Sequence, residues 1–476
     1  MLLKHGAIYL LVRLTPGAVA FASLVTYTRL LAPEDYGAYV LVITTVSLVQ
    51  VILFRWLELS LLRLLPACED NPQRLLSTIL GLYLWLCLLT AAVGSVAWLL
   101  LTDPLMRRLL LIGMPILWGY AWLNINLKLC QSSLMPIRYG ALLLLRSTST
   151  LAVGVALVLY GLGAYGPLLG VLLGTVLACL LAVSWQWRGV RPSIDRQLAG
   201  EVARYGLPLT GSMALVVVMG SADRFMIARF LGADSVGVYS AAYDLTAQSL
   251  TLLMMSVNLA ATPLAIRAYE SGGISGALTQ LRQHGAFLLS ISLPATLGII
   301  VLANPLADVL LGQEYRAAGR LILPWIALAV FISGLKVYLF DMAFQLSRRS
   351  GAMMWSVGAA AICNVLLNFW WIPLFGVIGA AWATVVSYIV ALVICISIGR
   401  RLIPIQVDWS QALRIACASS AMLLVIVSIP DRPGVLGLSI RIFSGAAVYG
   451  FTAAFLNVMG VRAHLLNWLD SKIRAS

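Results

Sequence analysis

Charged residues inside apolar segments are the residues of this sequence best suited to bind a ligand. Nine of them lie in stretches long and apolar enough to cross a bilayer: Arg13, Arg55, Arg146, Arg224, Lys336, Glu58, Asp223, Asp244 and Asp341. A charge at the centre of a membrane helix costs about 2.5–3.5 kcal/mol. Nine such charges facing lipid would cost more than the roughly 5–15 kcal/mol by which a folded domain is stable. Most of them must therefore face one another or a water-filled interior.

The five basic residues predict an anion site. Arg13, Arg55 and Arg146 lie in the first half of the chain, and Arg224 and Lys336 lie in the second half. The planar guanidinium group of arginine donates paired hydrogen bonds that match phosphate oxygens, and lysine adds a compact charge. We therefore expect a cationic interior that accepts an anionic, phosphate-like group.

Two of the acidic residues have a simple structural interpretation. Arg55 and Glu58 are three positions apart, which places them on one helix face where they can form an ion pair. Arg224 and Asp244 flank one turn at similar depth, about 10 Å into the membrane at 1.5 Å per residue. This placement predicts an ion pair within that hairpin and leaves the neighbouring Asp223 to face the interior.

The remaining interpretation of the acidic residues is functional. A carboxylate within the membrane is a candidate site for a cation, so Asp223, Asp244 or Asp341 would bind H⁺ or Na⁺ as a coupling ion. Arg13, Glu58 and Asp341 lie near predicted helix ends, where a side chain can extend to the membrane surface instead. The sequence leaves these alternatives open.

Signatures of catalysis are missing from the sequence. The motif GxGxxG occurs at residues 161–166, but it falls in a short turn between two apolar segments, whereas a dinucleotide site requires a strand before it and a helix after it. The seven cysteines have no CxxC spacing, and the three histidines lie near predicted helix ends. We therefore expect no metal, no cofactor and no enzymatic activity.

Composition identifies the elements that must position these charges. The chain has 476 residues, of which 61% are hydrophobic and 11% are charged, whereas about 25% of a soluble domain is charged. This predicts an all-α polytopic membrane protein, because a helix of about 20 apolar residues spans a bilayer. The apolar run that follows Lys4 is longer than a signal peptide requires, so we expect it to remain as the first helix. The fourteen predicted transmembrane helices are residues 7–30, 38–62, 76–101, 105–128, 139–160, 165–187, 206–230, 237–264, 283–303, 320–345, 352–372, 376–399, 410–429 and 437–459.

The distribution of basic residues predicts the orientation. With these helices, 19 of the 32 Lys and Arg residues fall on the side of the N-terminus and 8 on the opposite side. Basic residues concentrate in cytoplasmic loops, so both termini are expected in the cytoplasm. The same bias accounts for the net charge of +14 without any nucleic acid as a partner.

An internal repeat predicts two lobes. Residues 29–44, RLLAPEDYGAYVLVIT, match residues 229–244, RFLGADSVGVYSAAYD, in one Arg, one Leu, one Gly and one Tyr. Each copy has six helices, an even number, so the two copies share one orientation and form parallel repeats. Two such bundles would face each other across a central cavity. The predicted divisions are an N-lobe (1–187), a cytoplasmic linker (188–205), a C-lobe (206–400), and two further helices with a cytoplasmic tail (401–476).

Four stretches in the same order resemble the polysaccharide transporter family: RLLAPEDYGAY, ADRFMIARFLGADSVGVYSAAYDL, NPLADVLLGQEYRAAG and LFGVIGAAWATVVSY. That family includes O-antigen and exopolysaccharide flippases and lies within the multidrug/oligosaccharidyl-lipid/polysaccharide exporter superfamily. The resemblance covers most of residues 1–400. It implies two six-helix lobes, a cationic central cavity, and a location in the bacterial inner membrane. It also implies a substrate made of sugars on a polyprenyl pyrophosphate lipid, moved from the cytoplasmic to the periplasmic leaflet by alternating access.

The resemblance and the basic residues together predict a lipid-linked oligosaccharide flippase. The pyrophosphate would be neutralised by the five basic residues, Arg13, Arg55, Arg146, Arg224 and Lys336, while the polyprenyl chain stays in membrane lipid. Polysaccharide polymerase or export machinery would act as a partner. The alternatives are a cation-coupled multidrug exporter, a peptidoglycan lipid flippase, and a non-transporting scaffold of an envelope glycan complex.

Overall fold

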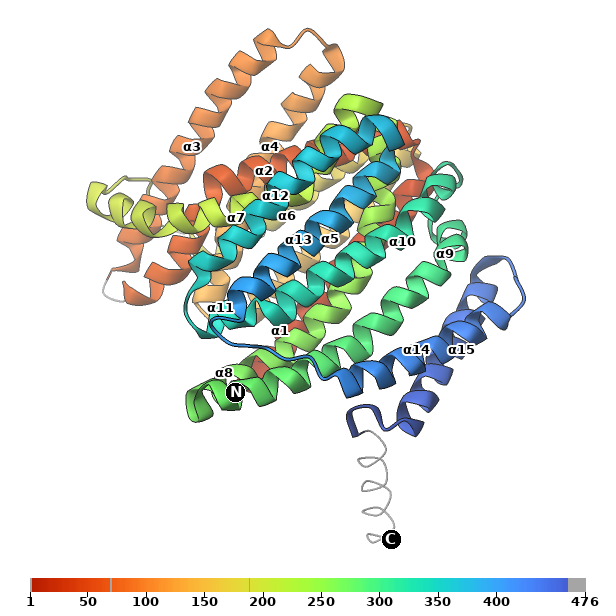
Figure 1. Ribbon diagram of the computed structural model, residues 1–476. Helices are drawn as coiled ribbons and strands as arrows, with labels where there is room; N and C mark the ends of the chain where they lie inside the picture. The colour runs from red at the N-terminus through yellow and green to blue at the C-terminus, as the bar shows by residue number, and fades with distance from the viewer. Residues whose placement is uncertain (1, 69–70, 188, 461–476) are drawn as a thin grey trace, which may run out of the picture. The chain divides into compact units, whose positions relative to one another are not determined.

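The computed structural model describes residues 2–68, 71–187 and 189–460, with side chains from Pro16 onward except at residues 105, 184, 186, 212 and 350. Within these residues the fold consists of helices joined by short connections, without a strand (Figure 1). The helices are α1 (Leu2–Leu30), α2 (Pro33–Leu64), α3 (Pro72–Leu100), α4 (Pro104–Ser132), α5 (Pro136–Leu159), α6 (Tyr165–Gln186), α7 (Arg196–Leu231), α8 (Ala233–Val301), α9 (Ala303–Leu310), α10 (Gln313–Leu335), the π-helical turn η2 (Lys336–Phe340), α11 (Met342–Leu346), α12 (Ser350–Phe375), α13 (Val377–Gly399), α14 (Trp409–Ser428) and α15 (Gly434–Phe455).

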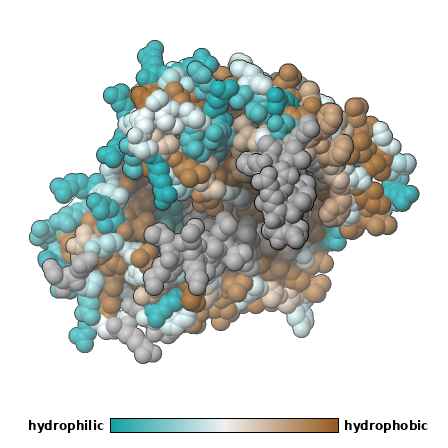
Figure 2. Space-filling model, turned by 90° about the horizontal axis from the view of Figure 1, so that it is seen from below, coloured by the Kyte–Doolittle hydropathy of each residue, from teal (hydrophilic) through white to brown (hydrophobic). Residues whose placement is uncertain are grey.

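Membrane-spanning helices make up most of the fold. Among the described residues, twelve helical segments are long and apolar enough to cross a membrane. One of them, α8, has 69 residues and holds two of the predicted crossings, and the 29-residue α1 holds the first. Figure 2 shows extensive apolar surface on one face of the molecule. Among the described residues, Leu88, Leu99 and Trp370 are exposed large apolar residues. The predicted class, an all-α polytopic membrane protein, is confirmed.

Two predicted loops are largely helical. The sequence predicted two membrane helices, 237–264 and 283–303, but α8 runs through the residues between them and is broken only at Gly273, where φ is 60° and ψ is −147°. Glycine reaches this conformation without steric cost. The residues between the predicted helices 283–303 and 320–345 are occupied by α9 and the start of α10. The segment of α8 around Gly273 was missed because it is polar, and α9 was missed because its eight residues are too few to span a membrane.

Contacts divide the chain into two compact units, Met1–Gly237 and Val238–Ser476. In the first unit, α5 packs on α1 and α6, and α2 packs on α4 and α7. In the second, α13 packs on α10 and α12, and α15 packs on α9 and α14. The lobe and linker boundaries predicted from the sequence stay a prediction, and the C-terminal tail from residue 461 onward lies outside the described residues.

Each unit has an apolar core of its own. In the first, α2, α3, α4 and α6 contribute fully buried side chains that include Leu57, Ile79, Ile116 and Leu168. In the second, α8, α11 and α13 contribute Met254, Leu288, Phe344 and Cys395. Close packing of this kind holds membrane helices together, because lipid chains are as apolar as the side chains themselves.

The two copies of the repeated motif contact each other in the first unit. A Cβ atom added to Gly37 on α2 would overlap the carbonyl oxygen of Ala233, and one added to Gly237 would overlap the carbonyl oxygen of Pro33. The backbones can approach this closely only because both positions lack a side chain. The repeat that the sequence shows as a similarity is therefore also a physical contact.

Helix α7 is fixed to the first unit at its N-terminal end. Ser60 Oγ on α2 donates a hydrogen bond to the carbonyl oxygen of Val202 at 2.7 Å. Asp195 caps α7 by accepting from the backbone N–H of Gln197, and it accepts from Arg74 Nε at 2.7 Å. The hydrogen bond from Arg74 and the backbone N–H groups hold the pKa of Asp195 below its usual value.

Candidate functional site: charged and aromatic residues in the membrane helices

A buried carboxylate on α2 is held by two neighbouring side chains. Arg55 Nη1 lies 2.7 Å from Glu58 Oε2, and Gln50 Nε2 donates to the other oxygen, Glu58 Oε1. The pairing that the three-residue spacing allows is therefore formed. Glu58 is fully buried, so it does not extend to the membrane surface as its position near a helix end had suggested, whereas the Arg55 side chain is 28% exposed.

Helix α4 adds a second cation next to this pair. Lys128 Nζ donates to Gln131 Oε1 at 3.0 Å and also acts electrostatically on Glu58. Two cations, Arg55 and Lys128, therefore surround one carboxylate, and the group carries a net positive charge. Lys128 was not among the residues predicted for the anion site, because its position at the end of a predicted helix placed it in a loop.

Arg146 on α5 lies against an aromatic ring of α4. Its guanidinium carbon is 4.3 Å from the ring centroid of Tyr120, which is the geometry of a cation–π contact. The side chain is half-buried, and its charge also acts on Cys179 of α6. Helix α4 thus lies next to two of the predicted arginines of this unit: Tyr120 contacts Arg146, and Lys128 acts electrostatically on Glu58, the partner of Arg55.

An aromatic row crosses the same unit. The ring centroids of Phe54 and Tyr83 are 5.9 Å apart, those of Tyr83 and Trp122 are 5.0 Å apart, and those of Trp122 and Trp187 are 4.6 Å apart. Trp187 Nε1 donates to the buried Asn126 Oδ1 at 2.7 Å. The rings fix α2, α3, α4 and the end of α6 in one arrangement, because edge and tilted aromatic contacts are directional.

Three of the predicted charged residues lie on α7 and near the start of α8. Asp223 is buried, whereas Arg224 and Asp244 are half-buried. All three have interaction partners. The predicted ion pair between Arg224 and Asp244 stays a prediction. Arg13 lies on α1, but its side chain falls outside those that the structure describes.

The second unit contains an ion pair in which both side chains are buried. Lys336 Nζ lies 3.0 Å from Asp341 Oδ1 and 2.9 Å from Oδ2, with side-chain exposures of 6% and 3%. Cys395 Sγ on α13 donates to Asp341 Oδ1 at 3.3 Å. Asp341 is thus another carboxylate that does not extend to the surface, and its negative charge balances the positive charge of Lys336.

The π-helical turn explains how these two residues meet. Residues five positions apart point about 140° away from each other on an α-helix. In η2 the backbone N–H of Asp341 donates to the carbonyl oxygen of Lys336 at 2.8 Å, which is the i to i−5 bond of a π-helix. This wider turn brings both side chains to one face, and hydropathy gives no sign of it.

A small hydroxyl-lined pocket lies beside this turn, between α8, α10 and α13. Its volume is about 130 Å³, and its lining includes Tyr243, Thr251, Ser333, Tyr338 and Tyr388. Phenol rings offer flat apolar faces and polar edges together. The sequence analysis did not select these residues, although three tyrosines within apolar segments were a signal that could have been used.

Comparisons with known proteins place the fold and the family. Residues 27–320 match the family described as "Polysaccharide biosynthesis protein". A curated relative, the amylovoran biosynthesis protein AmsL of Erwinia amylovora, is 28% identical over 170 residues, which is 36% of this chain and 43% of that protein. The chain thus spans less than half the length of this relative.

Solved structures with a similar fold are membrane transport proteins. The lipid II flippase MurJ in an inward closed conformation has a TM-score of 0.81 and 14% identity, covering 95% of this chain and 99% of that one. An inward-facing multidrug resistance MATE transporter has a TM-score of 0.61 and 14% identity, covering 84% and 98%. At these identities the likeness establishes the fold.

Proposed function

Because the chain belongs to the polysaccharide biosynthesis protein family, we propose that it is a flippase for a polyprenyl-pyrophosphate-linked oligosaccharide. It moves this lipid from the cytoplasmic to the periplasmic leaflet of the bacterial inner membrane by alternating access, with both termini in the cytoplasm. Two comparisons support the proposal: a relative named for the biosynthesis of a polysaccharide, and a fold similar to that of a lipid flippase.

The observation that carries the proposal is the excess of cations in the membrane helices of the first unit. Arg55 uses one Nη atom for Glu58, and a guanidinium has five N–H donors in all. The Arg146 guanidinium carbon lies 4.3 Å from the ring centroid of Tyr120, and a guanidinium can keep N–H donors for a ligand while it contacts a ring. Both side chains are partly exposed. We therefore assign the pyrophosphate contacts to Arg55 and Arg146, with Arg224 and Arg13 as further candidates.

Lys336 has a different place in this proposal. Its charge is balanced by Asp341 within a buried pair, and a neutralised cation attracts a phosphate weakly. We therefore assign Lys336 to the stability of the second unit rather than to the pyrophosphate. Ion coupling through Asp223 or Asp244 stays a separate hypothesis, and unchanged ion dependence of transport in their Asn variants would exclude it.

The membrane potential supplies a driving force for this direction of transport. Moving one negative charge outward across an inside-negative membrane is favourable by about 2.3 kcal/mol per 100 mV, so a dianionic head group gains nearly 5 kcal/mol. This gain biases export without hydrolysis of a nucleotide. We expect transport into energised vesicles to rise with the potential.

A second candidate substrate is a peptidoglycan precursor, because the fold similarity to the lipid II flippase extends over 95% of the chain. A cation-coupled multidrug exporter is favoured less, since the buried carboxylates Glu58 and Asp341 are already paired with Arg55 and Lys336. A scaffold without transport activity would not need partly exposed arginines in its membrane helices.

Reconstitution in liposomes tests the proposal. Movement of a labelled polyprenyl-pyrophosphate glycan is measured by the accessibility of its label to a membrane-impermeant reagent, alongside lipid II and an organic cation. We expect wild type to move the oligosaccharide lipid and Arg146→Ala to lose at least about tenfold in rate, since charge-assisted hydrogen bonds contribute about 1.5–3 kcal/mol. Arg267→Ala is the control, because Arg267 is exposed. Transport of the organic cation alone would refute the proposal.

A further inference from the structure

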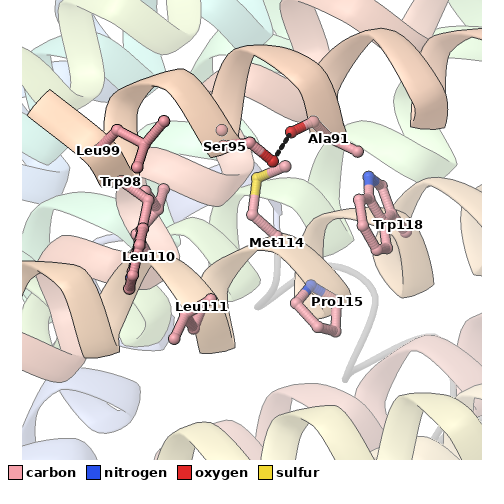
Figure 3. Close-up of a pocket in the computed structure, with 10 residues that line it drawn as sticks. Ala91, Ser95, Trp98, Leu99, Leu110, Leu111, Met114, Pro115 and Trp118 are labelled. Atoms are coloured by element: carbon pink, nitrogen blue, oxygen red, sulfur yellow. Dashed lines mark hydrogen bonds between the residues drawn. The ribbon is translucent and has the colours of Figure 1, made fainter.

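A groove between α3 and α4 in the first unit is an apolar recess whose lining includes no charged residue. It has a volume of about 490 Å³ and is lined by Gly94, Ser95 and Trp98 on one side and by Leu110, Met114 and Trp118 on the other. Figure 3 shows the side chains of the two helices facing each other across this space. Its size falls in the range of about 300–1,000 Å³ that is typical of ligand pockets.

Two of the polar side-chain groups that line the groove, Ser95 Oγ and Trp118 Nε1, already have hydrogen-bond partners within the protein. Ser95 Oγ donates to the carbonyl oxygen of Ala91 at 2.8 Å, as the dashed line in Figure 3 shows. Trp118 Nε1 donates to Thr90 Oγ1 at 2.9 Å. A ligand in the groove would therefore meet mainly hydrocarbon, sulfur and ring faces, which suits an apolar chain better than a sugar or a nucleotide.

The shape of the groove is built into the two helices. A Cβ atom on Gly94 would lie 2.8 Å from Met114 Cε, so the missing side chain makes room for the methionine at the base. Pro115 lies inside α4, where it removes one backbone hydrogen bond and bends the helix. Leu99 and Leu111, which are 68% and 58% exposed, form the open edges. The recess is therefore open at an apolar edge of the unit's surface.

Cations lie at one end of the groove. The guanidinium of Arg107 stacks on the Trp98 ring at 5.1 Å, and Arg107 Nε donates to the carbonyl oxygen of Leu101 at 2.6 Å. Arg108 beside it is exposed, and Asp103 in the same turn has interaction partners of its own. Two arginines against one aspartate leave a net positive charge, which the N-terminus of α4 reinforces.

We propose that this groove binds a single-chain lipid phosphate, with its hydrocarbon chain between α3 and α4 and its phosphate on Arg107 and Arg108. A polyprenyl phosphate or pyrophosphate has this form, because one chain ends directly in the phosphate. A glycerophospholipid has two chains and a glycerol spacer, so it would leave one chain outside and hold its phosphate farther from the groove.

The position of the groove gives the site a role, which rests on the proposed function. In the predicted orientation, the turn between α3 and α4 lies at the periplasmic face. A lipid bound there has already crossed the membrane. The groove therefore retains the carrier lipid on the release side, away from the arginines of α2 and α5 that we assign to the initial pyrophosphate contacts.

Lipid binding to the purified full-length protein tests this site without requiring transport. Native mass spectrometry in detergent compares polyprenyl phosphate, the uncharged polyprenol and phosphatidylglycerol. We expect polyprenyl phosphate to bind at least about tenfold more tightly than the other two, a difference of about 1.4 kcal/mol. Equal binding of phosphatidylglycerol would overturn the single-chain assignment, and equal binding of polyprenol would overturn the role of the arginines.

Variants locate the site within the molecule. Ser95→Trp fills the groove and Arg107→Gln removes the charge stacked on Trp98, and we expect each to weaken polyprenyl phosphate binding by about tenfold or more. Val93→Trp is the matched control, because Val93 is 63% exposed on α3 and does not line the groove. Unchanged binding in both groove variants would overturn the proposal.

A crosslinking experiment avoids variants that fail to fold. A polyprenyl phosphate with a photoreactive chain should label wild-type peptides that contain Met114 or Trp118, and labelling confined to other helices would refute the site.

A failure of the proposed function can be distinguished from a failure of this site. Wild type that binds the lipid at this groove but moves none in liposomes would keep the site and remove the flippase activity.

Discussion

The ion pair on α2 and the ion pair at the π-helical turn contain similar residues but differ in how much of the cation is exposed. Arg55 and Glu58 are three positions apart, and the arginine side chain keeps 28% of its surface exposed. Lys336 and Asp341 are five positions apart, and both are almost completely buried. An arginine can hold a carboxylate with one edge and a ligand with another, whereas a buried lysine surrounded by its partner cannot. The comparison shows that two cations predicted from the same kind of sequence position differ in the exposure left for a ligand.

Removing one partner of the buried Lys336–Asp341 pair should have the largest effect on stability. Asp341→Ala leaves the Lys336 ammonium buried without its carboxylate, and breaking such a pair costs about 3–5 kcal/mol. We expect a strong fall in the unfolding midpoint of the purified protein. The double variant Lys336→Met with Asp341→Leu should recover most of the loss, and a double variant as unstable as the single one would contradict a simple pair.

The Arg55–Glu58 pair, whose arginine is partly exposed, should matter less for stability and more for transport than the buried Lys336–Asp341 pair. In Arg55→Ala, Glu58 keeps its hydrogen bond from Gln50 and the field of Lys128, so we expect a smaller loss of stability, about 1–3 kcal/mol. Transport in liposomes should fall by about tenfold or more. Arg55→Lys is the matched variant, because lysine keeps the positive charge but lacks the paired N–H donors of the guanidinium. If Arg55→Ala lost stability as Asp341→Ala does but kept its transport rate, the two pairs would be equivalent.

The contact under Arg146 allows a finer test of how an exposed arginine is positioned. Tyr120→Leu removes the aromatic face while leaving the charge, and cation–π contacts contribute about 0.5–2 kcal/mol. We expect a transport rate several-fold below wild type with little change in the unfolding midpoint. Tyr120→Phe retains the ring and should behave as wild type. Loss of transport in both variants would assign the role to the hydroxyl instead.

The smallest effect is expected for two ion pairs outside the membrane, one in each unit. Arg74 pairs with Asp195 at the cap of α7, and Arg282 pairs with Asp408 at the cap of α14, where Nε and Oδ2 are 3.0 Å apart. Hydrogen bonds lower the pKa of both carboxyl groups below the usual 3.8, chiefly those from Arg74 at Asp195 and from the backbone N–H of Gln411 at Asp408. Their contribution is thus present above pH 3.8 and is lost as the pH falls through the lowered values.

Asp195→Asn and Asp408→Asn provide the measurement. Each should reduce the fall of the unfolding midpoint between pH 5 and pH 3 slightly and to a similar extent, because both carboxylates are capping residues with an arginine partner. A much larger change for one variant would show that the two units depend differently on their caps. The same variants should leave transport at neutral pH near the wild-type rate.

Hydropathy and charge were enough to predict the helices and their class. The long apolar segments of α2, α10 and α13 are detected because lipid is the solvent and each helix must satisfy its own backbone. Local spacing also predicted the contact between Arg55 and Glu58, since neighbours on one helix turn meet regardless of the rest of the fold. Hydropathy did not predict the polar part of α8 around Gly273, because a helix exposed to water lacks a long apolar segment.

The sequence by itself determined the number of membrane helices, the internal repeat, the basic residues within the membrane and the family that the motifs resemble. Each of these depends on composition or on local spacing. Only the tertiary structure decided that Lys336 is closed off by a π-helical turn, that Gly37 packs against the copy of its own motif, and that α3 and α4 leave a groove ending at Arg107. These features depend on backbone geometry and on contacts between distant residues, which no local pattern of hydropathy or charge encodes.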